Sequence, residues 1–326
     1  MNNFWSEKKV FVTGADGFIG SWVTKELQEK NADVTVLVRD LKKNACFDLH
    51  DLRDKINVVQ GDLVDLGLIE RTLAQYETEY VFHLAAQAIV GVANKSPLST
   101  FESNIKGTWN ILEAARRRDP IEGVIVACSD KAYGIQEKLP YTEETPLMGL
   151  FPYDASKACA DILARSYTKT FDLPLAVTRN ANTYGGADLN FSRIVPDAIR
   201  CLIKGQTFKI RSDGNPERDY MYVKDAASSY LVLAENVKRK EVKGQAFNFG
   251  TETPIKAVDL FKKIAKIYGN PEAKMQILDQ SKNEIPKQYL SISKAKKVLG
   301  WKPKYSLEQG LKETIEWYNS FFKNKS

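Results

Sequence analysis

Tyr153 and Lys157 are the residues whose types and spacing point most directly to chemistry. They are four positions apart, so on a helix both side chains lie on one face. An ammonium group beside a phenol favours the phenolate, as does a positive nicotinamide, and this moves the pKa of a tyrosine from about 10 toward neutrality. Tyr153 can then take a proton from an alcohol while hydride leaves the same carbon for the cofactor. Ser129, which ends a predicted strand, is expected to hydrogen-bond that oxygen.

Asp130 and Lys131 follow Ser129 directly and form a second candidate pair. Once a carbon is oxidised to a ketone, the hydrogen on the next carbon becomes acidic, so a base can remove it while an acid protonates a departing oxygen. Lys131 is the candidate base if its surroundings lower its pKa. Asp130 is the candidate acid if its surroundings favour the protonated form. The alternative is a surface Asp and Lys that cap the turn between a strand and a helix.

Three glycines, Gly14, Gly17 and Gly20, lie between a β-branched run and an amphipathic segment. In this context glycine lets the backbone turn tightly and approach a pyrophosphate, while the following helix supplies free amides and its positive dipole end. The sequence therefore predicts a dinucleotide site. Its other predicted contacts lie in this loop, after the third and fourth predicted strands, and in the tyrosine–lysine pair: Asp16, Phe18, Ile19, Asp62, Leu63, Leu84, Ala85, Ala86, Tyr153 and Lys157.

The choice of dinucleotide rests on Arg39 and Asp40, at the end of the second predicted strand. Asp40 lies twenty residues beyond Gly20, where an acid that binds the adenosine ribose is expected, and it favours NAD. Arg39 leaves NADP as the alternative, because a guanidinium there could hold a 2'-phosphate. Asp62 also has two interpretations, as a contact to the adenine or as a carboxylate that caps a turn.

These residues must be positioned by the elements around them. Short β-branched runs alternate with helical patterns over the first 180 residues: KKVFVTG, DVTVLVR, INVVQGD, YVFHLAA, GVIVACS and PLAVTRN are the runs, and 19–30, 66–76, 97–118 and 153–171 the helical segments. Strands buried on both faces and joined by helices form a parallel doubly wound sheet. We therefore expect an α/β fold of Rossmann type in residues 1–180, and in residues 181–326 a smaller substrate-binding lobe that is interleaved with the first.

Composition narrows the class of protein. With 326 residues, 43% apolar and 27% charged, the chain is too apolar for a disordered protein and too charged for a membrane-embedded one. The net charge of +6 is spread along the chain, which argues against nucleic acid and suits a small anionic substrate. Four widely spaced cysteines predict neither disulfides nor a metal site. No signal or membrane segment is recognised, so we expect a cytoplasmic protein.

The motifs together resemble the extended short-chain dehydrogenase/reductases of the nucleotide-sugar epimerase and dehydratase group. The resemblance covers nearly the whole chain, from VFVTGADGFIGSW through HLAAQ, SNIKGTWNILEAAR, PYDASK, RNANTYGG and RDYMYVKDAA to LGWKPKYSLEQGLKETIEWY. It implies a bound NAD(P) and the oxidation of a sugar carbon. Ser129, Tyr153 and Lys157 fall on the catalytic positions of this group, and Asn104 on a supporting position at the cofactor.

The same resemblance implies which residues bind a nucleotide-diphosphate sugar. Gln87 belongs to the HLAAQ motif, and Asn182, Arg193 and Arg218 fall on family positions near the diphosphate, which arginine suits as an anion-binding residue. A surface ion pair is the alternative for each of the last three. The two long helices predicted near Pro97 and Tyr153 resemble the pair that forms a four-helix dimer interface in this family, so a homodimer is expected.

Within the group, the segment CSDKAYG separates two activities. The 4-epimerases usually carry small or hydroxylic residues after the catalytic Ser or Thr, whereas the 4,6-dehydratases carry an acid followed by a second proton-transfer group. Asp130 and Lys131 therefore favour a nucleotide-sugar 4,6-dehydratase, with a 4-epimerase as the alternative. The Ser-Asp-Lys sequence and GGADLNFSRIVPD most resemble the dehydratases of CDP-glucose, but the segment Arg218-Asp219-Tyr220 resembles the wider family, which leaves the nucleotide open.

Overall fold

A seven-stranded parallel sheet forms the centre of the protein in a computed structural model that describes residues 3–41, 45–280 and 285–324. The strand order is β11-β6-β5-β4-β1-β2-β3, and every neighbouring pair is parallel. The strands are β1 (Lys9–Thr13), β2 (Asp33–Val38), β3 (Asn57–Gln60), β4 (Tyr80–His83), β5 (Gly123–Ser129), β6 (Leu175–Asn180) and β11 (Ala246–Phe249). The prediction of a Rossmann-type doubly wound sheet is confirmed.

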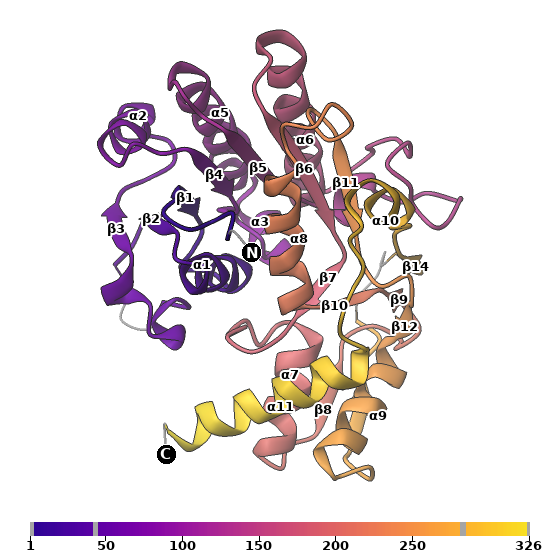
Figure 1. Ribbon diagram of the computed structural model, residues 1–326. Helices are drawn as coiled ribbons and strands as arrows, with labels where there is room; N and C mark the ends of the chain where they lie inside the picture. The colour runs from indigo at the N-terminus through magenta and orange to yellow at the C-terminus, as the bar shows by residue number, and fades with distance from the viewer. Residues whose placement is uncertain (1–2, 42–44, 281–284, 325–326) are drawn as a thin grey trace.

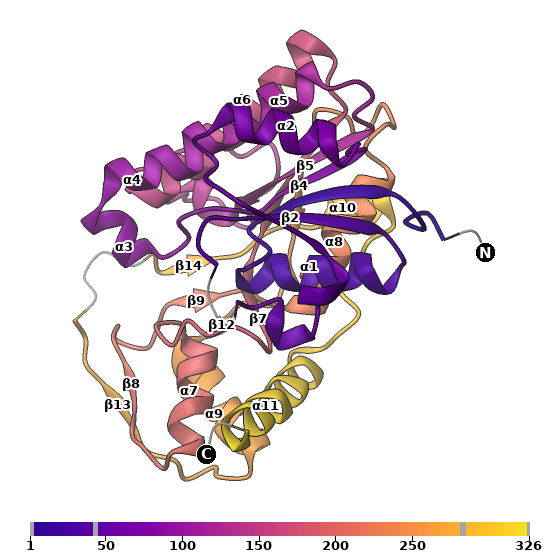
Figure 2. The same ribbon diagram turned by 90° about the vertical axis from the view of Figure 1, so that its left-hand side faces the viewer.

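Helices cover both faces of this sheet, which explains why its strands are apolar without alternation. One face carries α2 (Leu66–Gln75), α5 (Gly107–Arg117) and α6 (Pro152–Phe171), and the other carries α1 (Phe18–Glu29) and α8 (Val223–Glu235) (Figure 2). Successive residues of a strand point to opposite faces. In β1, Val10 and Val12 accordingly belong to the apolar cluster on the side of α1 and α8, whereas Phe11 belongs to the cluster on the side of α5.

The segment predicted as one helix over 97–118 is helical over 97–117 and contains a π turn. After the short α3 (Val90–Lys95), the chain forms α4 (Pro97–Phe101), a π-helical turn η3 (Glu102–Lys106) and then α5. The π turn includes Asn104, whose side chain is hydrogen-bonded outside the helix to Gln87 and Ser156. Such single π turns are frequent at functional sites. Three short 3-10 helices complete this half: η1 (Asp48–His50), η2 (Arg53–Lys55) and η4 (Asp130–Tyr133).

The chain beyond β6 builds a second layer of structure below the sheet (Figure 1). Its helices are α7 (Ile194–Ile203), α9 (Ala257–Tyr268) and α11 (Leu307–Lys323), whereas α10 (Ser293–Leu299) packs against β11 beside the sheet. Its strands form three small sheets: β7 (Asn182–Tyr184) with β10 (Tyr220–Tyr222), β8 (Phe208–Ile210) with β13 (Met275–Ile277), and β9 (Glu217–Arg218) between β12 (Ile255–Lys256) and β14 (Lys287–Gln288). The division at residue 180 stays a prediction.

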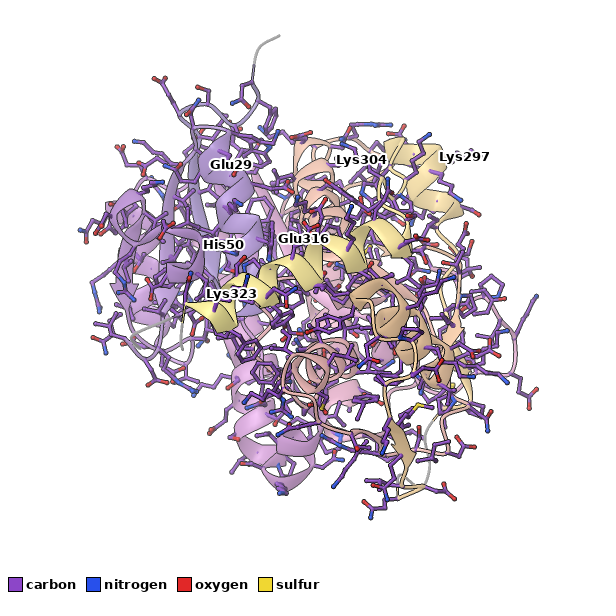
Figure 3. The ribbon with its side chains drawn as sticks, turned by 90° about the horizontal axis from the view of Figure 1, so that it is seen from below. Glu29, His50, Lys297, Lys304, Glu316 and Lys323 are labelled. Carbon is purple, nitrogen blue, oxygen red and sulfur yellow. The ribbon has the colours of Figure 1, made fainter. Side chains whose placement is uncertain are left out.

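Two elements from the second half of the chain return to the central sheet. Helix α8 packs against α1, and β11 pairs with β6 as the edge strand. Seen from below, the chain then runs from α10, which carries Lys297, through Lys304 into α11, which carries Glu316 and Lys323 (Figure 3). Among the residues that the structure describes, no helix has the length and apolar character needed to cross a membrane. The same residues include no group of three or more His, Cys, Asp or Glu side chains suited to a metal ion.

A buried ion pair joins β6, α6 and the turn after β5. The guanidinium of Arg179 donates to both oxygens of Asp161 at 2.8 and 2.9 Å, and its Nη1 donates to the Tyr133 hydroxyl at 2.8 Å. Arg179 and Asp161 are fully buried. Asp161 also accepts from Arg165, whose side chain is 42% exposed. The pair therefore fixes the helix that carries Tyr153 against the turn η4.

The two arginines that share Asp161 should contribute very differently to stability. Arg179→Met should lower the free energy of unfolding by about 3–5 kcal/mol, because it leaves a buried carboxylate with only its exposed partner. Arg165→Met is the matched control and should cost less than about 1 kcal/mol, since an exposed ion pair is screened by solvent. Urea denaturation followed by circular dichroism measures both. Equal losses in the two variants would contradict this assignment.

Candidate active site

A cavity of about 340 Å³ opens along the carboxyl ends of β1, β2, β4 and β5. This is where ligands bind in open α/β sheets, next to the point at which the strand order reverses. The cavity is lined by Thr13, Gly14, Asp16, Gly17, Phe18, Ile19, Gly20, Leu37, Arg39, Asp40, Gly61, Asp62, Leu63, Leu84, Ala85, Ala86, Gln87, Ala88, Ser103, Ala127, Cys128, Tyr153, Lys157, Arg193 and Tyr230. All residues predicted from the sequence to contact the dinucleotide lie in this wall except Asn104.

The loop between β1 and α1 has room only for glycine at two positions. Gly14 has φ +77°, and a Cβ there would lie 2.7 Å from the backbone nitrogen of Ala85. A Cβ on Gly20 would lie 2.1 Å from the carbonyl oxygen of Gly14. Gly17 is the N-cap of α1 and has no side chain that could cap the helix. The helix N-terminus therefore presents its backbone to the cavity. These features fit a pyrophosphate held by backbone amides and the helix dipole.

The two residues on which the dinucleotide preference rests interact with each other. Arg39 Nε donates to Asp40 Oδ2 at 3.3 Å, and both side chains are exposed at the cavity wall. A ribose hydroxyl would meet Asp40, and a 2'-phosphate would meet Arg39. Asp62 lines the cavity and also accepts from the backbone N–H of Val64 at 3.1 Å, so it caps its own turn.

Asn104 lies behind the cavity and holds one of its walls. Its Oδ1 accepts from the backbone N–H of Gln87 at 2.7 Å, and its Nδ2 donates to the carbonyl of Gln87 at 3.2 Å and to Ser156 Oγ at 2.9 Å. The side chain is buried. Asn104 thus ties the loop after β4 to the helix that carries Tyr153 and Lys157.

Tyr153 and Lys157 lie on α6 and both line the cavity, as their spacing predicts. Lys157 Nζ donates to the carbonyl oxygen of Ala127 at 2.9 Å, and burial lowers its pKa. The lowering of the Tyr153 pKa expected from the sequence is not produced by the groups of the chain. Burial raises the pKa of Tyr153, and a hydrogen bond with Ser129 offsets only part of this effect. Desolvation of the phenolate therefore outweighs its neighbours.

Asp130 and Lys131 form a largely buried cluster with Ser129 at the end of β5. Ser129 Oγ donates to Asp130 Oδ1 at 3.0 Å, and Lys131 Nζ donates to Asp130 Oδ2 at 3.4 Å. The side chains of Asp130 and Lys131 are 4% and 20% exposed, so this pair is not the solvated surface pair of the alternative interpretation. Burial lowers the pKa of Lys131, as a base requires, while Asp130 opposes the shift.

The four residues predicted to bind substrate lie at different depths. Gln87 and Arg193 line the cavity. Arg193 Nη1 also donates to both oxygens of Asp188 at 3.0 Å, which is the ion pair of the alternative interpretation. Asn182 and Arg218 lie on β7 and β9 of the second layer. Arg218 is near enough to the buried cluster to lower the pKa of Lys131.

Several residues at or beside the site were not predicted from the sequence, and four of them bear on its chemistry. Cys128 and Tyr230 line the cavity, and Cys128 Sγ lies 3.3 Å from the carbonyl oxygen of Lys157. Asp154 follows Tyr153 in the chain and is buried, and its pKa rises to about 6 through burial, which Lys131 opposes and Asp130 reinforces. Its position next to Tyr153 is a signal that the sequence offers. Gln288 lies 157 residues from Lys131, to which it is hydrogen-bonded, so no local pattern could reveal it.

The sheet, the glycine loop and the cavity define a dinucleotide-binding protein of the Rossmann class. The chain belongs to the family described as GDP-mannose 4,6 dehydratase, whose model matches residues 11–314. This confirms the resemblance to the nucleotide-sugar dehydratases and epimerases, and it makes the protein an enzyme of that family.

Some relatives of this chain are 4,6-dehydratases and others are 4-epimerases. The chain is 31% identical to a CDP-glucose 4,6-dehydratase of Salmonella typhimurium, over 99% of this chain and 94% of the relative. It is also 31% identical to a UDP-glucose 4-epimerase of Mycolicibacterium smegmatis, over 98% and 99%. Among solved structures, a UDP-glucose 4-epimerase of Thermotoga maritima with UDP-glucose has a TM-score of 0.88 at 29% identity, covering 96% of this chain and 99% of that one. A dTDP-glucose 4,6-dehydratase of Streptomyces venezuelae with NAD bound has a TM-score of 0.87 at 25% identity, covering 95% and 96%.

The glycine loop gives a test that does not depend on turnover. Gly20→Ala should weaken dinucleotide binding about tenfold or more, because its Cβ collides with Gly14 and only 1.4 kcal/mol of distortion is needed for that factor. Gly91→Ala on α3 is the control, since its Cβ has no atom within 4 Å and alanine favours a helix. Isothermal titration with the dinucleotide measures both variants. Unchanged affinity of Gly20→Ala would remove the loop from the binding site.

Proposed function

We propose that the protein is a nucleotide-sugar 4,6-dehydratase that uses bound NAD to convert an NDP-hexose into an NDP-4-keto-6-deoxyhexose. The observation that carries this proposal is the buried Asp130–Lys131 pair beside Ser129. Oxidation at C4 alone needs a hydroxyl, a tyrosine and a lysine, whereas elimination across C5 and C6 needs two further proton-transfer groups. The similarity to the Salmonella typhimurium enzyme makes CDP-glucose our proposed substrate.

A 4-epimerase is the second candidate, favoured by the similarity to the two UDP-glucose 4-epimerases. It would use Ser129, Tyr153 and Lys157 in the same way and would leave Asp130 and Lys131 as structural residues of the turn. The burial of this pair, and the lowered pKa of Lys131, favour the dehydratase. A buried ionisable pair has no structural advantage over apolar residues of the same size.

The roles of the chain's own groups follow from their places. The glycine loop, Asp40 and Lys157 would hold the dinucleotide, which when bound accepts a hydride and later returns it. Ser129 would hydrogen-bond the C4 oxygen, and Tyr153 would take the proton of the C4 hydroxyl. Burial raises the pKa of Tyr153. The charge that favours its phenolate would therefore come from the positive nicotinamide of the bound dinucleotide. Lys131 would remove the C5 proton, and Asp130 would protonate the departing C6 oxygen.

We also propose that Gln87, Asn182, Arg193 and Arg218 bind the nucleotide-diphosphate sugar, with the two arginines meeting the diphosphate. A homodimer completes the proposal. The helices α4, α5 and α6 expose large apolar side chains, including Leu98 at 71%, Trp109 at 43% and Ile162 at 54%. An apolar face of this kind marks a protein interface.

Labelling at C5 separates the two candidate activities. With CDP-glucose in deuterated water, the wild-type product should gain deuterium at C5 and lose the mass of water. Asp130→Asn and Lys131→Met should slow this elimination by about a hundredfold to ten-thousandfold, because each removes one proton-transfer group. Both should leave oxidation at C4 close to wild type, which the absorbance of the reduced nicotinamide measures in a single turnover. Mass spectrometry and NMR of the products give the loss of water and the C5 label.

Tyr153→Phe is the control, because it should stop oxidation and elimination together while nucleotide-sugar binding is kept. A product of unchanged mass, inverted at C4 and free of C5 deuterium, would reject the dehydratase. Panels of UDP-, dTDP- and GDP-hexoses run in parallel identify the nucleotide.

The dinucleotide preference is tested on Arg39. We expect the protein to bind NAD more tightly than NADP, because Asp40 is placed to meet the ribose hydroxyls and its charge disfavours a 2'-phosphate. Arg39→Ala should change NAD affinity less than about threefold, since an exposed guanidinium contributes little to binding a ribose that carries no 2'-phosphate. Titration of the stripped protein with both dinucleotides measures this. Tighter binding of NADP, lost in Arg39→Ala, would reverse the assignment.

A further inference from the structure

A glutamine far along the chain contacts the Asp130–Lys131 pair from the side of the second layer. Gln288, on β14, is fully buried. Its Oε1 accepts a hydrogen bond from Lys131 Nζ, and its Nε2 donates to the backbone carbonyl of Asp130 at 3.0 Å. The side-chain amide of Gln288 therefore binds both residues that are proposed to carry out the elimination. It does so from a strand that is far from them in the sequence.

The bond to Asp130 determines which end of the amide faces the lysine. Since the carbonyl of Asp130 only accepts hydrogen bonds, Gln288 must present Nε2 to it, and Oε1 is then left for Lys131. An amide oxygen accepts from an ammonium and from a neutral amine alike. Gln288 can therefore stay hydrogen-bonded to Lys131 before and after the lysine takes a proton.

Charged groups of both signs lie around Lys131, which makes the neutrality of this partner matter. Asp130 on the same turn and Asp154 on α6 favour the ammonium form, whereas burial and Arg218 on β9 oppose it. Asp219, beside Arg218, is buried but is bound by the backbone N–H groups of Thr251 and Glu252. A third carboxylate in contact with Nζ would favour the charged form further.

The strand that carries Gln288 is itself tied to the proposed substrate site. In the small sheet, β14 pairs with β9 in parallel, and Gln288 is the partner of Arg218 in that register. The amide therefore reaches Lys131 from a strand whose position depends on the residue proposed to bind the diphosphate. An apolar residue at 288 would keep the packing and lose the hold on the lysine.

We propose that Gln288 is a positioning residue for the elimination step: it anchors the Lys131 amine through a neutral acceptor, beside Asp130, without adding a negative charge that would keep the amine protonated. This rests on the proposed function, in which Lys131 is the C5 base. Gln288 touches neither of the reacting carbons in this role and acts through Lys131.

Two isosteric substitutions separate anchoring from charge. Gln288→Glu should raise the pKa of Lys131 by about one pH unit or more, because an adjacent carboxylate favours the ammonium. Acetylation of Lys131 by acetic anhydride across a pH series, quantified by mass spectrometry of its peptide, measures this in the protein without substrate. The rate of elimination rises with pH as its base loses a proton, so its acidic limb should move to higher pH by the same amount.

Gln288→Met keeps the volume and removes both hydrogen bonds. It should slow C5 deuterium exchange about tenfold or more, and C4 oxidation less than about threefold, because only the C5 base loses its anchor. Gln245→Glu and Gln245→Met are matched controls: Gln245 also accepts from a lysine, Lys294 at 3.1 Å, but on the surface away from the site. Both should behave as wild type in each assay.

The outcomes distinguish this inference from the proposed function. If the wild-type product carries no C5 deuterium, the dehydratase proposal fails, and if Lys131→Met leaves C5 exchange intact, Lys131 is not the C5 base. If Lys131→Met abolishes exchange while Gln288→Glu leaves the acetylation midpoint of Lys131 unchanged, the role of Gln288 is rejected and the dehydratase stands. Equal slowing of oxidation and elimination in Gln288→Met also rejects it, since this would show a general effect on structure. Thermal melting of each variant confirms that it is folded, and if Gln288→Glu is not, the Met variant decides alone.

Discussion

The parallel register of β1, β4 and β5 is the constraint on which the rest of the site depends. Thr13 is paired with His83, and His83 with Val126, so β1 and β4 end at one level while β5 continues to Ser129 against β6. The glycine loop and the loop after β4 consequently leave the sheet together beside Ala127 and Cys128, and all of them line one cavity. The same register brings the backbone of Ala85 against Gly14, where no side chain fits. The need for glycine and the formation of the cavity thus have one cause.

Burial then decides the protonation of the groups around this cavity. Lys131 and Lys157 both have lowered pKa values, and Tyr153 and Asp154 both have raised ones, with desolvation the largest cause in every case. Burial therefore favours the neutral forms of these four groups. Proton transfer between neutral groups creates charge only as the reaction proceeds, so neighbours that stabilise this charge are the ones that control the rate.

The sequence predicts the parts of the site that depend on local geometry. Tyr153 and Lys157 share a helical face, and the glycines of the first loop are recognised from the strand before them and the helix after them. The number and parallel pairing of the strands up to β6 follow from their unbroken apolar character. The helix predicted over 97–118 forms, but helical periodicity does not reveal the π turn within it, which accompanies the tertiary hydrogen bonds of Asn104. The lowered pKa expected for Tyr153 stays a prediction for the protein with bound dinucleotide, because in the chain alone burial raises this pKa, and burial is a property of the folded chain.

What the sequence could not predict comes from contacts between distant segments. Gln288 and Tyr230 reach the site only because β11 and α8 return to the sheet while β9 and β14 remain in the second layer. This interleaving places the elements of the second layer directly against the turn that follows β5. A substrate held by Arg218 would therefore be held by a strand whose neighbour contacts Lys131, so binding and proton removal share one small sheet. Under that arrangement a change in the length or register of β14 would alter the reaction before it altered the fold, because the central sheet is complete without it.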